Sequence, residues 1–426
     1  EIPGDGIDND MNGFVDDANG WDFFDDDNNP EPVGAADNHG TAVAGVAVAA
    51  GDNTLGVSGS CPDCAFMPLK LFTQGASFRA SVTDFQAGLA FDYARAMGAT
   101  VITNSWGLTG GTLYPYTIPA LDRAAADEIS VLFSGRNIAG LDICAADGIR
   151  ARETSFSVSS TDNFDRWVNS HSLGDCIDIL APTRGNAGTL GITTTDRLGT
   201  DGYASGDYTA GFGGTSSATP LVAGIVGLIR SADPTLTRGT TQALIQDTGD
   251  KVENTQGAYD ARTGFSTTST HSFGRVNAYE AVRIAAPVSQ GGKGGVDVFV
   301  RDNNLDWGNT EQPSNTRFES PRGHIAHWRS VDIKIDAPPF QTPPSNSAEF
   351  DAFVDEQPSA GLNNRVYVRV RNRGPVTATD ITVKLMWTHW GTTFGNLPAD
   401  FWVNFPADPF YPAAFPECMR FNAIDG

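Results

Sequence analysis

A histidine and a serine stand in two short motifs whose residue types suit nucleophilic chemistry. His39 lies in Asn38–Gly45 (NHGTAVAG), directly before a stretch rich in Ala and Val. Ser216 follows two glycines in Gly213–Gly224 (GGTSSATPLVAG), and Pro220 falls in the first turn of the apolar helix expected there. A histidine beside a serine hydroxyl can accept its proton and activate it as a nucleophile. Taken singly, each motif also fits a residue that only caps a helix.

Two further segments lie between these motifs, Asn104–Gly107 (NSWG) and Gly135–Asn137 (GRN). Together the four motifs resemble those of the subtilisin-like serine proteases, in the order found in that family. The resemblance extends from about Asp5 to Ala285 and includes Asp178–Pro182 and Phe273–Val282. It implies a secreted or cell-surface serine endopeptidase that hydrolyses peptide bonds of a protein or peptide substrate through an acyl-enzyme.

The resemblance also assigns roles to individual residues. Ser216 would be the nucleophile, His39 would be the general base, and Asn137 would donate its side-chain amide to the oxyanion of the tetrahedral intermediate. The backbone of three residues would line the cleft and pair with an extended peptide: Ser105, Trp106 and Gly107. One departure concerns Arg136, because the family usually has a Gly before this Asn, and a Gly permits a special backbone angle.

The family's third catalytic residue is an Asp that ends an apolar strand in Asp-Thr-Gly or Asp-Ser-Gly. No such triplet precedes His39, and Asp247–Gly249 follows Ser216 in a stretch that matches a helix-to-loop region of the family. We therefore expect the triad Asp, with its strand, to come from an upstream segment or a second chain. Residues 1–426 alone would then be an impaired enzyme. The alternative is an inactive protease-like fold that serves as a calcium-stabilised adhesion or structural module.

An acidic segment opens the chain. Residues 1–37 contain twelve Asp or Glu and no Lys or Arg. Within them, Asp8–Asp17 (DNDMNGFVDD) matches the first half of a calcium loop, with oxygen side chains at positions 1, 3 and 5, and Gly at position 6. Asn19 stands where Glu closes such loops, so another acid would complete the shell. The predicted Ca²⁺ ligands, with Phe14 contributing its carbonyl, are Asp8, Asp10, Asn12, Phe14, Asp16 and Asp17. A cluster of Asx turns without metal is the other interpretation.

Strands and helices in alternation would position these motifs. Apolar runs bounded by turn residues predict buried strands at Ala65–Phe72, Thr100–Thr103, Ile129–Phe133 and Cys176–Leu180. Ala-rich stretches between and after them predict helices at Ala42–Ala50, Ala87–Met97, Pro119–Asp127 and Ala218–Ser231. This alternation predicts an α/β fold with a parallel sheet covered by helices on both faces.

The pattern changes near Ala286, and we expect a domain boundary there. Residues 1–286 would form the catalytic domain without its N-terminal strand, and 287–295 (PVSQGGKGG) would form a flexible Gly-rich linker. Val366–Gly374 and Ile381–Trp387 alternate in period two, which predicts an all-β sandwich of immunoglobulin-like size over 296–426 that could be incomplete. His324 and His327 are three residues apart, but packing beside Trp328 is favoured over metal binding.

The overall composition excludes several classes of partner. The formal net charge is −23, which repels phosphate backbones, so we expect no nucleic-acid partner. No apolar run reaches the roughly 18 residues that a membrane-spanning helix needs. The five cysteines predict one or two disulfides with a thiol left over. Cys61 and Cys64 would form a local disulfide or stay as thiols, because no second Cys or His pair stands nearby to complete a zinc site.

Overall fold

The computed structural model describes residues 1–34, 37–73, 83–107, 114–185, 188–252, 272–300, 331–359, 362–379 and 381. The chain divides into two compact units. The first holds Glu1–Gly295 and Arg373–Pro375, and the described part of the second consists mainly of Val296–Val300 and Asp332–Asn372.

A four-stranded parallel sheet forms the centre of the first unit. Its strands are adjacent in the order of the chain: β3 (Val101–Asn104), β4 (Ser130–Ser134), β5 (Ser155–Thr161) and β6 (Ile179–Pro182). Because the strands are parallel, their carboxyl ends and the loops that follow them lie along the same edge of the sheet. This edge carries Ser105–Gly107 after β3 and Gly135–Asn137 after β4.

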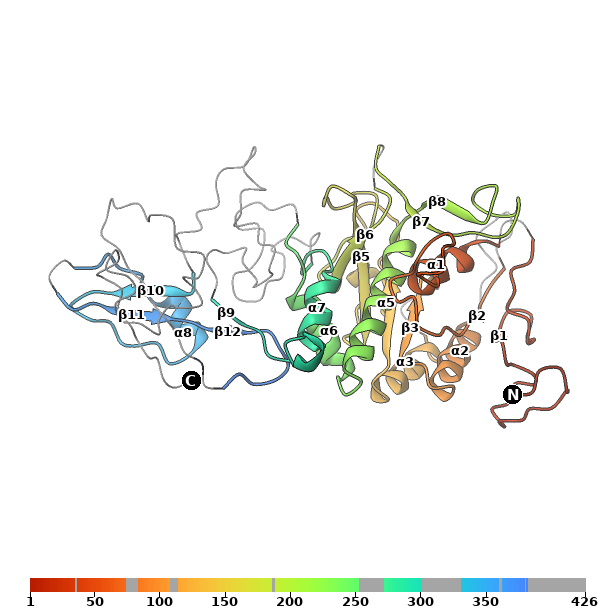
Figure 1. Cartoon of the computed structure of the whole chain (residues 1–426), viewed down its shortest axis with the longest axis horizontal. Helices are drawn as coiled ribbons and strands as arrows, with labels where there is room; N and C mark the ends of the chain where they lie inside the picture. The colour runs from red at the N-terminus through yellow and green to blue at the C-terminus, as the bar shows by residue number, and fades with distance from the viewer. Residues whose placement is uncertain are drawn as a thin grey trace. The chain divides into compact units, whose positions relative to one another are not determined.

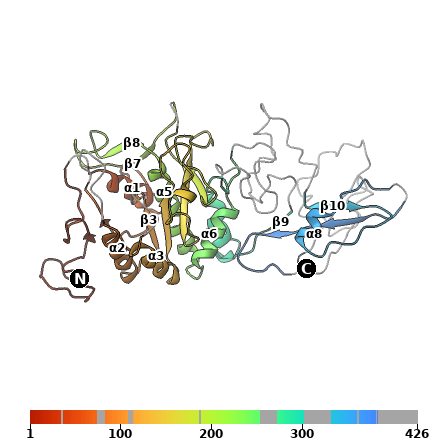
Figure 2. The ribbon, with the colours of Figure 1, turned by 180° about the vertical axis from the view of Figure 1, so that it is seen from behind.

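Helices cover both faces of this sheet, as the alternating pattern predicts. Leu132 of β4 packs on one face against α5 (Thr215–Ala232), α6 (Arg238–Asp247) and α7 (Ala278–Ala285). Its neighbour Phe133 packs on the other face with α2 (Asp84–Ala96) and α3 (Thr117–Ala126). Figure 1 shows α5 beside the strands, and the view from behind in Figure 2 again shows α2 and α3 side by side. Successive residues of β4 therefore face opposite helical layers.

The boundaries of several elements differ from the sequence-based expectations. The strand predicted over Ala65–Phe72 shortens to β2 (Leu69–Lys70), which pairs in parallel with β1 (Trp21–Asp22) outside the four-stranded sheet. Strand β5 was not predicted, because five of its seven residues are Ser or Thr and the segment does not form an apolar run. All seven are nevertheless buried.

Smaller elements complete the first unit. Helix α1 (His39–Val48) begins three residues before the predicted start, and α4 (Ile143–Ala146) is a single turn. Strands β7 (Ile192–Thr195) and β8 (Tyr208–Phe212) form an antiparallel pair. Disulfides join Cys61 to Cys64 and Cys144 to Cys176, in agreement with the expected one or two bridges, while Cys418 lies outside the described residues.

The segment 287–295 is more ordered than a flexible linker. It contains a short 3₁₀ helix, η1 (Val288–Gln290), and its glycines fold back over the end of α7. The backbone N–H groups of Lys293, Gly294 and Gly295 donate to carbonyls of Arg283, Ala286 and Ile284. The backbone of this Gly-rich segment thus supplies hydrogen-bond donors to carbonyl groups at the end of α7. Periodicity alone did not indicate this role.

The second unit contains two short antiparallel strand pairs. Strand β9 (Val298–Phe299) pairs with β12 (Arg371–Asn372), and β10 (Ile333–Asp336) pairs with β11 (Arg365–Val368). A short helix, α8 (Ser347–Ala352), was not predicted. His324, His327, Trp328 and nearly all of Ile381–Trp387 lie outside the described residues, so the sandwich stays a prediction. No helix in the described ranges is long and apolar enough to span a membrane.

Candidate active site

Ser216 lies in the first turn of α5, which is held rigidly by its buried residues. Val222 and Val226 of this helix are fully buried against the sheet. Gly214 precedes the helix with φ of 79°, and a Cβ atom there would lie 2.7 Å from Nδ2 of Asn137. Only Gly combines this positive φ with such a close approach. Gly214 therefore lets Asn137 approach the backbone two residues before Ser216.

The serine also contacts the segment that follows β3. The hydroxyl of Ser105 donates to the carbonyl oxygen of Ser216 at 2.9 Å, and Oγ of Ser216 lies 3.4 Å from the carbonyl oxygen of Ser105. Ser216 itself is only partly buried, so its hydroxyl is reachable. The structure thus brings the start of α5 to the carboxyl edge of the sheet, beside the backbone of Ser105–Gly107.

The side-chain amide of Asn137 is oriented by Thr215. The backbone N–H and hydroxyl of Thr215 donate to Oδ1 of Asn137 at 2.9 and 3.0 Å. Because Oδ1 is occupied as an acceptor, Nδ2 is left as the donor, and it lies beside Gly214, two residues before Ser216. Asn137 is exposed, so this donor can meet a developing negative charge on a substrate oxygen.

Arg136 occupies the position where the resemblance leads one to expect Gly. Its φ is 66°, in the left-handed region that residues with side chains rarely adopt. The Arg thus takes up the backbone angle that a Gly permits, and Asn137 still reaches the start of α5. The cost of such a conformation is on the order of 1 kcal/mol.

His39 is the first residue of α1, which packs against α5. A Cβ atom on Gly224 of α5 would lie 2.9 Å from the carbonyl oxygen of Ala47 in α1. Ala42 comes before Ala47 in α1, and Leu221 comes before Gly224 in α5. Ala42 and Leu221 belong to the same smaller apolar cluster. The two helices therefore run in the same direction along their contact. His39 lies eight residues before Ala47, and Ser216 lies eight residues before Gly224, so both are at neighbouring ends of the helix pair.

The imidazole of His39 is in the state that a general base needs. It packs edge-on against the ring of Phe212 in β8, with ring centroids 5.7 Å apart. Burial lowers the pKa of His39 to about 4, so the ring is neutral at pH 7. Among the described residues, neither Ser216 nor any carboxylate hydrogen bonds to this ring. Nothing described therefore fixes its tautomer.

Three buried acids precede His39. Asp17 belongs to the opening loop, and Asp22 and Asp37 are engaged elsewhere. Asp22 at the end of β1 forms an ion pair with Lys70 at 2.7 Å, and Asp37 accepts a hydrogen bond from the N–H of Val33 at 2.9 Å. Asp247, in the triplet set aside from sequence, is the last residue of α6. The sequence did not indicate the ion pair between Asp22 and Lys70, because these two residues meet only through the pairing of β1 with β2.

The sequence also did not indicate an ion pair between Arg150 and Asp147, which lies beside the segment Ser105–Gly107. Arg150 is almost fully buried, and its guanidinium donates to Asp147 at 2.5 Å and to the carbonyl oxygen of Trp106 at 2.8 Å. The spacing of three residues between Asp147 and Arg150 was the available signal. The arginine thus supports the backbone of the Ser105–Gly107 segment from beneath.

Acidic side chains converge in the opening loop. One carboxylate oxygen from each of Glu1, Asp8 and Asp10 lies within 4.8 Å of the others. Asp17 is 3% exposed, and its Oδ1 has no hydrogen-bond partner among the described residues. Its Oδ2 accepts from Tyr93 at 2.7 Å and from Asn12 at 2.8 Å. A buried carboxylate oxygen without a donor is suited to a hard cation such as Ca²⁺.

Asp16 and Phe14, which were also predicted as Ca²⁺ ligands, have other contacts. Asp16 accepts hydrogen bonds from the backbone N–H groups of Gly4, Asp5 and Gly6, so it organises the start of the chain. The ring of Phe14 packs edge-on against Tyr93 of α2, with centroids 4.9 Å apart. The loop is thereby attached to α2 by an aromatic contact, while its carboxylates remain concentrated.

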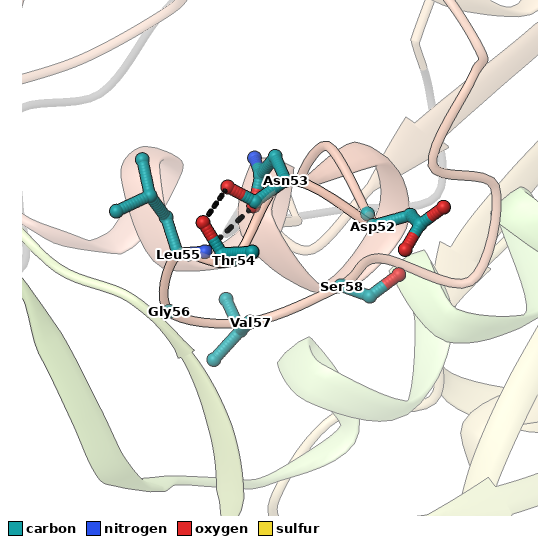
Figure 3. A pocket seen from close by; sticks show the side chains of 8 residues that line it. Asp52, Asn53, Thr54, Leu55, Gly56, Val57 and Ser58 are labelled. Carbon is teal, nitrogen blue, oxygen red and sulfur yellow. Dashed lines mark hydrogen bonds between the residues drawn. The ribbon is translucent and has the colours of Figure 1, made fainter.

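A shallow hollow elsewhere in this unit does not gather catalytic groups. It is lined by a single loop, 51–58, which follows α1 (Figure 3). The hydroxyl of Thr54 donates to the carbonyl of Asn53 at 2.6 Å, and Oδ1 of Asn53 accepts from the N–H of Leu55 at 2.9 Å. These polar groups satisfy one another, so the hollow offers little to a ligand.

Comparisons with known proteins identify a family and several relatives. A family profile described as the Subtilase family matches residues 5–274. The calcium-dependent protease of Trichormus variabilis is 32% identical over 288 residues, which cover 61% of this chain and 42% of that protein. Thermitase of Thermoactinomyces vulgaris is 30% identical over 264 residues, which cover 62% of this chain and 80% of thermitase. The match thus spans less than half of the first of these relatives.

A solved structure shows the same fold. The serine protease of Aeromonas sobria, in complex with its chaperone, matches with a TM-score of 0.55 and 19% sequence identity. The match covers 63% of this chain and 56% of that one. At this level of identity the likeness concerns the fold.

Proposed function

This chain belongs to the subtilase family, and we propose that it is a serine endopeptidase in which Ser216 is the nucleophile and His39 the general base. The observation that carries the proposal is the convergence of Ser216, Asn137 and Ser105 at the carboxyl edge of the sheet. The relatives named as proteases support the same activity.

In this mechanism the hydroxyl of Ser216 attacks the carbonyl carbon of the scissile peptide bond. Neutral His39 accepts the proton of the hydroxyl and later donates it to the leaving amine. Nδ2 of Asn137 donates to the oxyanion of the tetrahedral intermediate, where one such donor contributes about 3 kcal/mol, a magnitude that comes from subtilisin. Water then releases the acyl group from Ser216 by the reverse sequence of proton transfers.

The substrate is a protein or peptide in extended conformation. Its backbone pairs with Ser105, Trp106 and Gly107 as an added strand. The carbonyl of Trp106 is held by buried Arg150, which supports a rigid edge for this pairing. The sheet edge then aligns the scissile bond with Ser216.

The orienting acid of the triad is not assigned to any residue in 1–426. In this proposal a carboxylate from outside these residues meets His39, fixes its tautomer and stabilises its charged form. Hydrolysis by residues 1–426 alone is then slow. The lack of a described carboxylate hydrogen bonded to His39 also favours the second candidate function, an inactive fold with a binding or structural role.

The opening loop is the proposed calcium site. Asp8, Asp10 and Asp17 supply carboxylate oxygens together with Asn12 and the carbonyl of Phe14, and Glu1 joins them. Asp16 orders the backbone from Gly4 to Gly6 beside the site. Bound Ca²⁺ would offset the repulsion among these acids and hold the loop on α2. One relative is itself named a calcium-dependent protease.

The two units are proposed to have separate tasks. Residues 1–286 carry the chemistry, 287–295 connect, and 296–426 form a β-sandwich of immunoglobulin-like type that serves in attachment or docking. Relatives named extracellular proteases support a secreted or cell-surface location. The high negative charge disfavours a nucleic-acid partner.

Hydrolysis of an unfolded protein substrate tests the proposed function. Purified residues 1–426 should release new amino termini slowly, and Ser216→Ala should abolish this release. Ser58→Ala, at an exposed serine of the 51–58 loop, is the matched control and should leave the rate unchanged. Equal rates for Ser216→Ala and the parent chain would reject the assignment. Complete inactivity with an inert Ser216 hydroxyl would favour the binding role.

A further inference from the structure

One buried arginine links the ends of two neighbouring strands. The guanidinium of Arg150 donates from Nη2 to the carbonyl oxygen of Trp106 at 2.8 Å and from Nε to the carbonyl oxygen of Ser134. Trp106 lies two residues after β3, and Ser134 is the last residue of β4. The third nitrogen, Nη1, donates to Oδ2 of Asp147 at 2.5 Å. Arg150 therefore connects the segment after β3 with the segment after β4.

The guanidinium of Arg150 has a fixed place in the core. Arg150 is 1% exposed, and its guanidinium lies over the ring of Phe133, 5.4 Å from the centroid. Oδ1 of Asp147 accepts from the backbone N–H groups of Ile149 and Arg150. The carbonyl oxygen of Arg150 accepts from the hydroxyl of Ser157 in β5 at 3.1 Å. Both the side chain and the backbone of this arginine are therefore anchored.

The two connected segments differ in their other contacts. Asn137, after β4, is attached to α5 because its Oδ1 accepts from Thr215. Ser105, after β3, is attached through its hydroxyl to the first turn of the same helix. The next carbonyl along that segment, the carbonyl of Trp106, is the one that Arg150 holds. Loss of this contact would thus leave the reacting groups in place and alter the segment beyond Ser105.

The carbonyl of Trp106 also determines where the next N–H group points. A peptide unit is planar and trans, so the N–H of Gly107 points opposite to the carbonyl of Trp106. Because this carbonyl points at Arg150, the N–H of Gly107 points away from Arg150 and can donate to an extended peptide that pairs with the segment. Gly107 lies two residues beyond Ser105, at about 3.3 Å per residue of extended chain. Only a substrate of several residues reaches it.

We propose that Arg150 is a positioning residue that aligns the segment Ser105–Gly107 for extended substrates of several residues. The inference rests on the proposed function and specifies how the same site recognises its substrate class. Arg150 contacts neither the substrate nor the reacting atoms, and it acts through the peptide unit between Trp106 and Gly107. Its contribution therefore grows with the number of substrate residues that pair with the segment.

Covalent labelling by probes of two lengths tests this role. Both probes are diphenyl phosphonates with a Phe side chain next to phosphorus, and they contain one residue or four. In the labelling step Oγ of Ser216 forms a bond to phosphorus, its proton passes to His39, and phenoxide leaves. The length ratio is the labelling rate of Ser216 with the four-residue probe divided by that with the one-residue probe, followed by mass spectrometry. In the parent chain this ratio should be at least about tenfold, as one or two backbone hydrogen bonds would give.

Arg150→Lys is the central variant. The ammonium keeps a positive charge opposite buried Asp147, but one nitrogen cannot replace a planar fork whose nitrogens serve separate acceptors. The length ratio should fall about tenfold, while the rate with the one-residue probe stays unchanged. Arg152→Lys is the matched control, at a partly exposed arginine that pairs with Asp122 of α3, and it should change neither rate.

A second variant removes both charges of the buried ion pair. Arg150→Met combined with Asp147→Asn leaves no buried charge unpaired, so it provides a folded chain if Arg150→Lys does not fold. It should show the same fall in the length ratio. Melting temperatures are measured alongside, because a residue that only stabilises the fold would lower the melting temperature without changing the length ratio.

The outcomes separate this inference from the proposed function. A length ratio that stays at the parent value in a folded Arg150 variant, or an equal loss of rate with both probes, overturns the inference alone. A parent chain that labels equally fast with both probes also overturns it alone. If both probes and a simple fluorophosphonate leave Ser216 of the parent chain unlabelled, the inference and the proposed catalytic role are overturned together.

Discussion

The protonation state of His39 controls whether Ser216 can lose its proton. Burial against Phe212 and the surrounding chain lowers the pKa of this imidazole to about 4. The neutral ring is then the dominant form through the neutral range. An unfolded histidine titrates near 6.5, so folding shifts the titration toward acid.

This shift predicts the acid limit of Ser216 reactivity. In residues 1–426, the rate of fluorophosphonate labelling should stay level from pH 8 to about 5 and fall with an inflection near pH 4. Because the folded pKa is lowered, the unfolded chain binds more protons between about pH 4 and 6.5. The contribution of His39 to stability is therefore lost as the pH falls through this window. An inflection at or above 6.5 would contradict the burial argument.

Motifs indicate which residues to consider, whereas the hydrogen bonds of the candidate site come only from the fold. His39, Asn137 and Ser216 were singled out from motifs, and the structure places Asn137 against Gly214 and Thr215, the two residues before Ser216. That Thr215 orients Asn137, or that Arg150 supports Trp106, depends on backbone positions brought together by the fold. Such contacts between distant segments have no local signature.

At the scale of elements, Asp178 joins the sheet to a covering helix. It lies directly before β6, and its carboxylate accepts from the N–H of Ser157 in β5 at 2.6 Å. It also accepts from the side-chain amides of Gln242 and Gln246 in α6, both at 2.8 Å. One carboxylate thereby fixes the position of α6 relative to β5.

Asp178→Ala should therefore destabilise the first unit. Removing the acceptor leaves three donors without their partner in a largely enclosed place, at a cost of about 1–3 kcal/mol. Chemical denaturation measures the loss as a lower midpoint. Asp201→Ala, at an exposed acid, should change stability by less than about 0.5 kcal/mol. Equal effects of the two variants would show that the carboxylate does not connect β5 to α6.

The opening loop is the element expected to respond to metal. Without a cation, Glu1, Asp8 and Asp10 face one another with no Lys or Arg in residues 1–37. Removing Ca²⁺ with EDTA should increase hydrogen exchange over residues 5–22 before it affects β3–β6. Restored Ca²⁺ should reverse the change, and Mg²⁺ should do so less well. Unchanged exchange in residues 5–22 would reject the metal assignment.

Apolar periodicity predicted those elements whose buried residues are aliphatic. It identified α5 and β4 closely, since both are rich in Val, Leu, Ile or Ala. It failed for β5, because Ser side chains can be buried in a sheet where neighbouring strands satisfy the backbone. It also overestimated β2, where an apolar run extends beyond the two residues that pair with β1.

At the scale of the whole molecule, the boundary between the units lies after Gly295. The N–H groups of Gly294 and Gly295 donate to carbonyls at the end of α7, so these glycines belong to the first unit. Glu280 of α7 is held by Arg283 at 2.7 Å and by Arg373 at 3.3 Å. Arg373 thus stabilises the first unit, although it comes after most of the second unit in the sequence.

Truncation after Gly295 should leave the chemistry in place. A chain that ends at Gly295 should label at Ser216 as fast as residues 1–426. Its melting temperature should be a few degrees lower, since Glu280 loses Arg373. A matched chain with Arg373→Gln should show a similar shift with the second unit present. Unfolding of the truncated chain would show that the two units are not separable in function.

The central claim is that Ser216 is an activated nucleophile, and fluorophosphonate labelling mapped by mass spectrometry tests it most directly. The label should be found on Ser216, should be absent in Ser216→Ala, and should form at least about tenfold more slowly in His39→Ala, because general base catalysis contributes that much or more. Label spread over several serines, or an unchanged rate in His39→Ala, would contradict the account.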